Sequence, residues 1–279
     1  MLRIAVPNKG SLSETAADML QEAGYTGRRD PRALSALDTR NDVEFFYLRP
    51  RDIATYVGSG ALDVGITGRD LLLDSRSTAK EITSLDFGDS TFRFAAAPGR
   101  FTELSDLAGQ RVATSYPALV GDFLARHGVQ VTMVSLDGAV ESAVKLGVAD
   151  AVADVVSTGS TLRAQGLDIF GPVILESSAV LISASPDLAG IATLQRRLQG
   201  VLVARQFVLM DYDVPKKYLE AATAVTPGLE SPTISPMQDP DWVAVRAMVP
   251  RSDTNHVMDE LYEIGARAIL VSAVHAARI

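Results

Sequence analysis

Short apolar segments alternate with amphipathic segments along most of this chain of 279 residues. Residues 3–6, 63–67 and 151–156 are apolar runs of strand length, whereas residues 12–23 repeat apolar side chains at helical spacing. Strands that alternate with helices are typical of a mostly parallel sheet covered by helices. The sequence therefore predicts an α/β fold, and 47% hydrophobic residues supply enough apolar surface for a sizeable core.

Three regions are expected along the chain. Residues 91–177 hold a strand and helix alternation of their own, which predicts an inserted second lobe, while residues 1–90 and 178–205 form the first lobe. Two α/β lobes joined by a chain that crosses out and back enclose a cleft, and a cleft is the usual place for a ligand.

The last region, residues 206–279, follows the order βαββαβ of a ferredoxin-like unit. Its strands are predicted at residues 206–211, 233–236, 243–249 and 268–272, and its helices at residues 215–224 and 255–264. It carries no obvious catalytic residue, so regulation or assembly is favoured over chemistry.

Composition excludes several classes of function. The balance of 26 Lys and Arg against 34 Asp and Glu gives a charge of -8, the wrong sign for a protein that wraps nucleic acid. The absence of cysteine excludes disulfides, thiolate zinc sites and a cysteine nucleophile. Apolar runs stop short of the ~20 residues of a membrane helix, and the N-terminus does not resemble a signal peptide. We expect a cytoplasmic protein with neither nucleic acid nor membrane as a partner.

The most informative segment is residues 154–162, Asp-Val-Val-Ser-Thr-Gly-Ser-Thr-Leu. Here a loop rich in hydroxyl groups leads from an apolar strand into a helix, and such a loop suits a phosphate dianion. It is not a Walker A loop. The plainer alternative is that Ser157 and Thr158 cap the helix and Gly159 makes a turn. Asp154 favours the functional interpretation, because a carboxylate beside a phosphate must face ribose hydroxyls or Mg²⁺.

Ten positions around this loop form one pattern: Glu141, Gly147, Ala149, Val152, Asp154, Val155, Thr158, Gly159, Thr161 and Leu162. Further segments of the same kind are residues 7–13, 48–52, 62–70, 85–88, 113–117 and 227–233. Together they resemble the ATP phosphoribosyltransferase family over nearly the whole chain. Because the C-terminal module is present, the resemblance implies the long form, which needs no separate regulatory subunit.

The resemblance implies a two-lobed, periplasmic-binding-protein-like catalytic domain (type II) and the first step of histidine biosynthesis. N1 of ATP displaces pyrophosphate from C1 of phosphoribosyl pyrophosphate (PRPP), and Mg²⁺ is required. Such a reaction depends on alignment of the reactants and neutralisation of the departing pyrophosphate. The family also implies a homo-oligomer, dimer or hexamer, inhibition by histidine, and AMP as a further ligand.

By resemblance, Asp154 and Glu141 face the ribose of PRPP, although Glu141 is equally well explained as a surface carboxylate. The loop that takes the 5-phosphate comprises Val155, Ser157, Thr158, Gly159, Ser160 and Thr161. The ATP site comprises Lys9, Gly10, Arg49, Asp70 and Tyr116. The expected catalytic residues are Lys9, Arg49 and Asp154. Direct Mg²⁺ ligands are not identified.

Plainer roles stay open for several of these residues. Arg49 is also explained as a solvated surface residue, Asp70 as a helix N-cap, and Tyr116, the candidate for stacking on adenine, as core. Many family members have Arg where this chain has Ser11. One phosphate contact is therefore missing, or comes from another residue, for which Arg51 and Arg69 are the candidates.

The histidine site implied by the family comprises Asp213, Leu229, Thr233 and Ala268. Its plainer alternatives are Asp213 as a turn residue and Leu229 as core. Two other functions compete with the enzyme: a solute-binding protein that binds a small anion without reaction, and a catalytically silent regulatory partner. Fold alone does not separate them. The loop with Asp154 favours the enzyme, and Ser11 is the one hint of a silent partner.

Overall fold

The computed structural model describes residues 1–30, 32–156 and 159–278, and these divide into two compact units. The first unit comprises Met1–Gln21 and Tyr25–Gln195, and the second comprises Glu22–Gly24 and the chain from Arg196 onward. Two sheets belong to the first unit and one sheet to the second. None of the helices in the described ranges combines the length and apolar character needed to span a bilayer.

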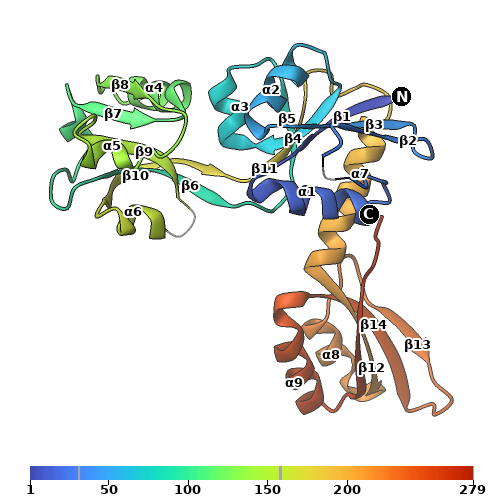
Figure 1. Ribbon diagram of the computed structural model, residues 1–279. Coiled ribbons are helices and arrows are strands. Elements are labelled where there is room, and N and C mark those ends of the chain that lie inside the picture. The colour runs from blue at the N-terminus through green and yellow to red at the C-terminus, as the bar shows by residue number, and fades with distance from the viewer. Residues whose placement is uncertain (31, 157–158, 279) are drawn as a thin grey trace. The chain divides into compact units, whose positions relative to one another are not determined.

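The first sheet has six strands in the order β2-β3-β1-β4-β11-β5 (Figure 1). Their bounds are β1 Leu2–Pro7, β2 Ser35–Asp38, β3 Val43–Leu48, β4 Val64–Gly68, β5 Lys80–Ser84 and β11 Ala179–Ser183. Strands β3, β1 and β4 are parallel, so their carboxyl ends meet at one edge. All five residues of β4 are buried, as expected of a central strand covered on both faces.

Three helices belong to this first sheet: α1 Ser11–Glu22, α2 Pro50–Gly58 and α3 Arg69–Ser75. Helix α2 begins with Pro50, which has no N–H to leave unpaired, and buries Ile53, Ala54 and Val57. Helix α1 buries Ala16, Met19 and Leu20 at helical spacing. The predicted end of α1 at Gly24 is confirmed, because Gly24 has a left-handed φ of 87°.

The second sheet, drawn mainly in green in Figure 1, has the order β10-β6-β9-β7-β8. Its strands are β6 Ser90–Ala96, β7 Arg111–Thr114, β8 Thr132–Ser135, β9 Ala151–Val156 and β10 Asp168–Ser177, and its helices are α4 Pro117–Arg126, α5 Ser142–Lys145 and α6 Ser160–Ala164. A 3₁₀ turn spans Leu104–Leu107. Strand β9 occupies the residues 151–156 predicted for it. The chain passes between the two sheets twice, from β5 to β6 and from β10 to β11.

One predicted helix is wrong. Helical spacing predicts a helix over residues 138–146, but α5 spans only Ser142–Lys145. Gly138 and Ala139 have φ angles of 144° and 49°, which no right-handed helix accommodates, so a turn occupies the first part of this segment. The turn leaves Glu141 immediately before the helix, with a half-buried side chain.

The second unit contains a four-stranded antiparallel sheet in the order β13-β14-β12-β15. Its strands are β12 Phe207–Pro215, β13 Thr233–Pro236, β14 Trp242–Pro250 and β15 Arg267–Ala273, and its helices are α8 Leu219–Val225 and α9 Thr254–Ile264. Helix α7 Ile191–Gln206 begins in the first unit and belongs to the second from Arg196 onward. Two 3₁₀ turns, Lys216–Tyr218 and Arg251–Asp253, precede α8 and α9. The predicted βαββαβ order is confirmed.

Alternation along β12 separates the two faces of this sheet. Val208, Met210, Tyr212 and Val214 are buried with apolar residues of α8 and α9, while the residues between them are only half-buried. Strand β14 alternates in the same way. One face is therefore packed against helices, and we call the other the open face.

Candidate active site

Strand β9 carries Asp154 near its carboxyl end. The Asp154 Oδ1 atom accepts a hydrogen bond from the N–H of Val155 at 2.8 Å. Burial raises the pKa of Asp154 above its ordinary value, and the neighbouring carboxylates of Glu141 and Asp70 raise it further. A carboxyl group whose pKa is raised by both burial and like charges is typical of a functional site.

Asp70, Glu141 and Asp154 together form what we call the carboxylate cluster. They come from α3, from the turn before α5 and from β9, so both sheets of the first unit contribute. None of the three forms an ion pair with a residue in the described ranges. Excess negative charge that is partly buried suits groups that donate hydrogen bonds or carry positive charge.

Asp70 is fixed by Ser177, which follows it by 107 residues. The Ser177 hydroxyl donates to Asp70 Oδ1 at 2.8 Å, and the Asp70 N–H donates to the same hydroxyl at 3.1 Å. The side chain is 7% exposed. Gly68, not Asp70, is the N-cap of α3, so the N-cap alternative is wrong. A Cβ at Gly68 would clash with Asp70 Oδ1, so a larger residue there would displace the Asp70 carboxylate from its bond with Ser177.

Tyr116 joins the carboxylate cluster from the residue before α4. Burial raises the pKa of its hydroxyl, and the carboxylate of Asp70, to which the hydroxyl donates a hydrogen bond, raises it further. The guanidinium of Arg51 lies 4.8 Å from the ring centroid, and the ring packs edge-on against Phe92 at 5.0 Å. Tyr116 thus packs against the core and also contacts charged groups.

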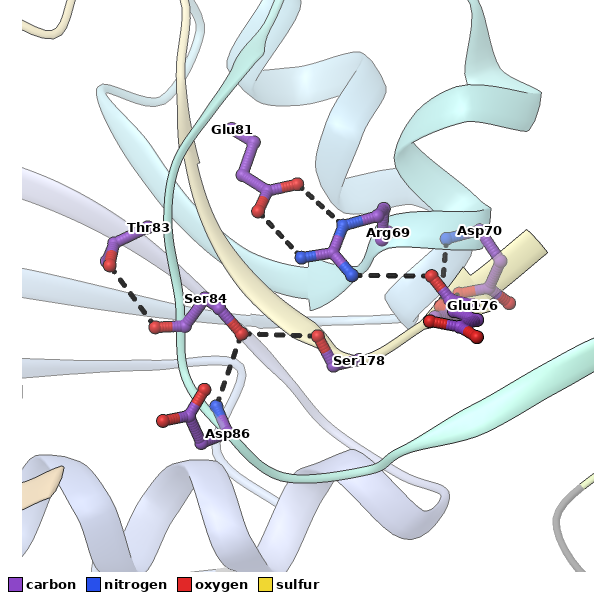
Figure 2. Close-up of polar contacts among 9 residues, drawn as sticks. Arg69, Asp70, Glu81, Thr83, Ser84, Asp86, Glu176 and Ser178 are labelled. Carbon is purple, nitrogen blue, oxygen red and sulfur yellow. Dashed lines mark hydrogen bonds and ion pairs between the residues drawn. The ribbon is translucent and has the colours of Figure 1, made fainter.

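Two arginines proposed as substitutes at Ser11 have different surroundings. Figure 2 shows Arg69 bound to both carboxylate oxygens of Glu81, each at 2.8 Å, and to the carbonyl of Glu176 at 3.3 Å. The pKa of Glu81 is lowered by this hydrogen bond. Arg51 instead pairs with Asp74 at 3.1 Å and keeps 47% of its side chain exposed beside Tyr116. Arg51 is therefore the more exposed of the two, at 47% against 27% for Arg69.

Hydrogen bonds in the same region link the two chain segments that pass between the sheets of the first unit. In Figure 2 the Ser84 hydroxyl lies 3.3 Å from the Ser178 hydroxyl and accepts from the Asp86 N–H at 3.4 Å. Ser84 ends β5, and Ser178 lies between β10 and β11. These hydrogen bonds hold the two connecting segments together next to Ser177, the partner of Asp70 in the carboxylate cluster.

Lys9 and Arg49 lie at the carboxyl ends of neighbouring parallel strands. Pro7 pairs with Leu48 in register, and the Asn8 N–H donates to the Leu48 carbonyl at 2.8 Å. Both cationic side chains are exposed, and in the part of the chain that the structure describes neither has a hydrogen-bond or ion-pair partner. The carboxyl ends of parallel strands are the usual ligand edge of such sheets. Gly10, with φ 80°, supplies the turn after Lys9.

The phosphate loop is described only in part, because Ser157 and Thr158 lie outside the described residues. Gly159 has a φ of 70° and precedes α6, while the side chains of Ser160 and Thr161 are exposed. Helix α6 has five residues, so its dipole is weaker than that of a long helix. Val155 is half-buried and contributes its N–H to Asp154.

Some polar residues of this region have no signal in the sequence. Ser177 lies in no motif, and Asp74 accepts from the N–H groups of Ala118 and Leu119 at 3.0 and 3.1 Å, across 44 and 45 residues. Arg93, opposite Asp154 in the sheet, donates to the Gly171 carbonyl at 3.1 Å. Its buried Nε has no partner among the described residues. The distances along the chain explain why no local pattern points to these contacts.

The open face of the C-terminal sheet holds a separate cavity of about 370 Å³. Its lining residues are Asp211, Tyr212, Asp213, Thr233, Ser235, Ala244, Val245, Arg246, Ala268 and Leu270. Three predicted histidine contacts, Asp213, Thr233 and Ala268, line it, whereas Leu229 does not. Asp213 lies within β12, so it is not a turn residue, and Leu229 is 44% exposed, so it is not core.

The residues of this cavity include a charged pair. Arg246 Nε donates to Asp211 Oδ1 at 2.7 Å. Ala268 has a φ of 49°, a conformation unusual for alanine, where the register of β15 against β12 shifts. The cavity therefore combines two carboxylates, a guanidinium and two hydroxyls around a backbone irregularity.

Comparison with known proteins places the whole chain. Residues 49–200 match the family HisG, ATP phosphoribosyltransferase, and residues 204–276 match the HisG C-terminal domain. The chain is 62% identical over 286 residues to an ATP phosphoribosyltransferase of Arthrobacter sp. (strain FB24), with 100% of both chains covered. It is 61% identical over 282 residues to an ATP phosphoribosyltransferase of Micrococcus luteus, again with 100% of both covered.

Solved structures agree with this placement. An ATP phosphoribosyl transferase (HisG:HisZ) complex from Thermotoga maritima is similar with a TM-score of 0.64 and 26% identity, covering 72% of this chain and 98% of that one. The GluR0 ligand-binding core from Nostoc punctiforme, with glutamate, has a TM-score of 0.50 and 16% identity and covers 71% of this chain and 92% of that one. The latter supports the two-lobed binding-protein fold alone. The chain belongs to the ATP phosphoribosyltransferase family, and its HisG C-terminal domain makes it a long-form member.

Proposed function

We propose that this chain transfers the phosphoribosyl group of PRPP to N1 of ATP, releasing pyrophosphate, in the first step of histidine biosynthesis. The observation that carries the proposal is the carboxylate cluster, in which the half-buried Asp154 lies next to Glu141 and Asp70. As the bond to pyrophosphate breaks, positive charge develops at C1 of the ribose. Fixed negative charge in a partly buried site stabilises such a transition state.

Asp154 and Glu141 accept hydrogen bonds from the two ribose hydroxyls in this mechanism. A carboxylate whose charge is disfavoured by burial gains most from donors that a bound sugar supplies. The 5-phosphate is bound by the loop of Val155, Ser157, Thr158, Gly159, Ser160 and Thr161. The positive φ of Gly159 and the exposed hydroxyls of Ser160 and Thr161 support that role.

ATP binds at the carboxyl ends of β1 and β3 in the first sheet. Lys9, Gly10 and Arg49 lie at the strand ends. The two cationic side chains, which have no partner in the part of the chain that the structure describes, suit the phosphates of ATP or the leaving pyrophosphate. Arg51 supplies the contact that Arg provides where this chain has Ser11. Tyr116, already beside Arg51, contacts the adenine and through Asp70 links the two substrates.

Mg²⁺ enters with the substrate phosphates. No group of three or more acidic or histidine side chains among the described residues is arranged to hold a metal ion. Mg²⁺ commonly binds through substrate phosphates and one or two carboxylates, and the carboxylate cluster fits that arrangement. When bound, the ion neutralises the departing pyrophosphate.

Histidine regulates the enzyme from the open-face cavity, with Asp213, Thr233 and Ala268 as contacts. Inhibition from a separate unit requires two states with different affinities for histidine, and the coupling is reciprocal, so substrates change histidine affinity by the same factor. We further expect a homo-oligomer, dimer or hexamer, and competition by AMP at the ATP site.

The decisive experiment measures product formation. Purified protein with ATP, PRPP and Mg²⁺ is expected to form phosphoribosyl-ATP, followed by ultraviolet absorbance with pyrophosphatase present. Calorimetry with PRPP separates the enzyme from a binding protein: both bind PRPP, but only the enzyme turns it over. The variant Asp154→Asn with Thr161→Ala is expected to lose PRPP binding while keeping its fold. Unchanged affinity would reject the assigned site.

A further inference from the structure

The open face carries its polar side chains in two adjacent rows across the sheet. In the first row Thr233, Arg246 and Asp211 lie directly opposite one another on β13, β14 and β12. In the second row Ser235, Ala244 and Asp213 do the same. Residues two apart on a strand share a face and are separated by roughly 7 Å. The cavity thus presents a guanidinium in one row and a carboxylate in the next.

Arg246 uses only one of its guanidinium nitrogens in a hydrogen bond within the described residues. Its Nε donates to Asp211 Oδ1 at 2.7 Å, with the two side chains 60% and 33% exposed. The structure records no partner within the described ranges for its two terminal nitrogens. A guanidinium held by one edge keeps a second edge with the geometry to bind a carboxylate through two hydrogen bonds. Asp211 therefore orients Arg246 without saturating it.

The second row supplies the complementary charge. Asp213 has neither an ion-pair partner nor a side-chain hydrogen bond among the described residues, and it lines the same cavity. A positively charged group bound near Asp213 places a carboxylate on the same ligand toward the row that holds Arg246. This pattern matches a zwitterion with a positively charged side chain or amine, and not a simple amine or a simple acid.

We propose that Arg246 binds the α-carboxylate of the amino acid effector, that Asp213 binds its ammonium or imidazole, and that Asp211 is a positioning residue for Arg246. The inference rests on the proposed regulatory function and deepens it by naming the group that selects a free amino acid. An effector without a carboxylate leaves the terminal nitrogens of Arg246 without that partner. It is therefore bound more weakly.

The test is a cycle of two ligands and two proteins, measured by calorimetry on the full chain. The ligands are L-histidine and L-histidinol, which has an alcohol where histidine has a carboxylate. The unsubstituted chain is expected to bind histidine roughly tenfold to a hundredfold more tightly, the range of a hydrogen bond between charged groups. In Arg246→Met the two ligands are expected to bind with nearly equal affinity, because only histidine loses its partner.

Two further variants separate this role from a general effect of charge. Arg267, opposite Asp213 on β15, donates to the carbonyls of Tyr262 and Ala266 and does not line the cavity. Arg267→Met removes the same charge from the same sheet and is expected to keep the preference for histidine. Asp211→Asn is expected to reduce the preference only in part, since it leaves Arg246 in place but less firmly oriented.

The outcomes are distinct. If Arg246→Met weakens both ligands equally, or keeps the preference for histidine, Arg246 does not bind the carboxylate and the inference is overturned. If Arg267→Met abolishes the preference as Arg246→Met does, the effect is one of net charge and the inference is likewise overturned. If the unsubstituted chain binds no histidine, the proposed regulation itself fails. Thermal unfolding of each variant identifies a change caused by loss of fold.

Discussion

The two candidate sites of this protein differ in whether their acidic side chains are paired with a cation. In the carboxylate cluster, Asp70, Glu141 and Asp154 lie close together, and none has an ion-pair partner in the described ranges. On the open face, Asp211 is already paired with Arg246 at 2.7 Å. The first arrangement places three acids together without ion-pair partners, which is unfavourable for the protein without ligand, whereas the second neutralises one of its two acids with Arg246 and leaves only Asp213 without such a partner among the described residues.

This difference fits the two tasks. A site that must stabilise positive charge in a transition state gains from carboxylates held near one another in advance, even though the fold is weakened by it. A regulatory pocket binds and releases its ligand unchanged, so it has no need of such a cost. The comparison can be tested by removing one acid at a time, beginning where the effect should be largest.

Asp154→Asn should have opposite effects on activity and stability. Removal of the negative charge is expected to lower turnover by about a hundredfold or more. Because the folded-state pKa of Asp154 is raised by burial and by Glu141, its ionisation weakens the fold at neutral pH and has no effect below both pKa values. The variant is therefore expected to melt at a higher temperature at neutral pH, with the difference shrinking as the pH falls through the folded pKa of Asp154.

Asp150→Asn is the matched control for that experiment. Asp150 precedes β9 and pairs with Arg111 at 3.0 Å, and the hydrogen bond from Arg111 lowers the pKa of Asp150. Its removal is expected to leave turnover unchanged and to lower the melting temperature slightly. If both variants melt at lower temperatures than the parent, Asp154 does not destabilise the fold and the comparison fails.

Asp213→Ala addresses the regulatory side. Loss of a charged acceptor is expected to raise the histidine concentration for half-inhibition by roughly tenfold or more. The measurement compares each variant with its own rate in the absence of histidine. Leu229→Ala is the useful companion, because Leu229 is 44% exposed and does not line the cavity. An equal loss in both variants would show that the cavity does not mark the contacts.

Two variants of Tyr116, next to the carboxylate cluster, distinguish the role of its ring from that of its hydroxyl. Tyr116→Ala removes the ring that packs under Arg51 and is expected to raise the KM for ATP by about tenfold, the scale of one stacked base. Tyr116→Phe keeps the ring and removes only the hydrogen bond to Asp70, so a smaller change is expected. Equal effects of the two variants would assign the role to the hydroxyl.

The smallest effect is expected for a paired acid outside the cluster. Glu81→Gln removes the partner of Arg69, and the pair is about one-third exposed, so the melting temperature is expected to fall by no more than about 3 °C. Since Arg69 lowers the pKa of Glu81, this stability is present above the ordinary carboxyl pKa of about 4.3 and is lost as the pH falls through the folded value.

A melting curve against pH for the parent and Glu81→Gln checks that sign. The two curves should converge in acid and diverge toward neutral pH. Asp122→Asn is the control, because the Arg76–Asp122 pair is 63% and 55% exposed and should contribute little. A change at Glu81 as large as that at Asp154 would show that pairing does not distinguish the two classes of acid.

Sequence patterns located β4 and β9 and, in the C-terminal sheet, the edge strands β13 and β15, but missed β2, β5 and β8. Strand β9, with Asp154 near its end, is an unbroken apolar run apart from that acid and occupies the predicted residues. Strands β5 and β8 contain no buried residue and β2 contains only one, so no apolar run marks them. The helix predicted over residues 138–146 was too long because periodicity does not register the backbone of Gly138 and Ala139.

For the sites, the sequence indicated which residue types are present but not which of them contact one another. Asp154 and Asp70 stand in motifs that resemblance identifies, and three of the four predicted histidine contacts, Asp213, Thr233 and Ala268, line the open-face cavity. The bond between Asp70 and Ser177 spans 107 residues, and that between Arg51 and Asp74 joins two helices. Contacts of this kind depend on the order of strands in the sheets, which alternation alone does not specify.

The two crossings between the sheets of the first unit have a mechanical consequence. A single connecting segment would let the two sheets rotate about any axis. Two connecting segments that are linked by the hydroxyls of Ser84 and Ser178 restrict twisting of one sheet relative to the other. Asp70 is hydrogen-bonded to Ser177 next to the second crossing, and Asp154 lies near the end of β9 in the second sheet. The chain topology therefore limits how the two sides of the carboxylate cluster are placed relative to each other.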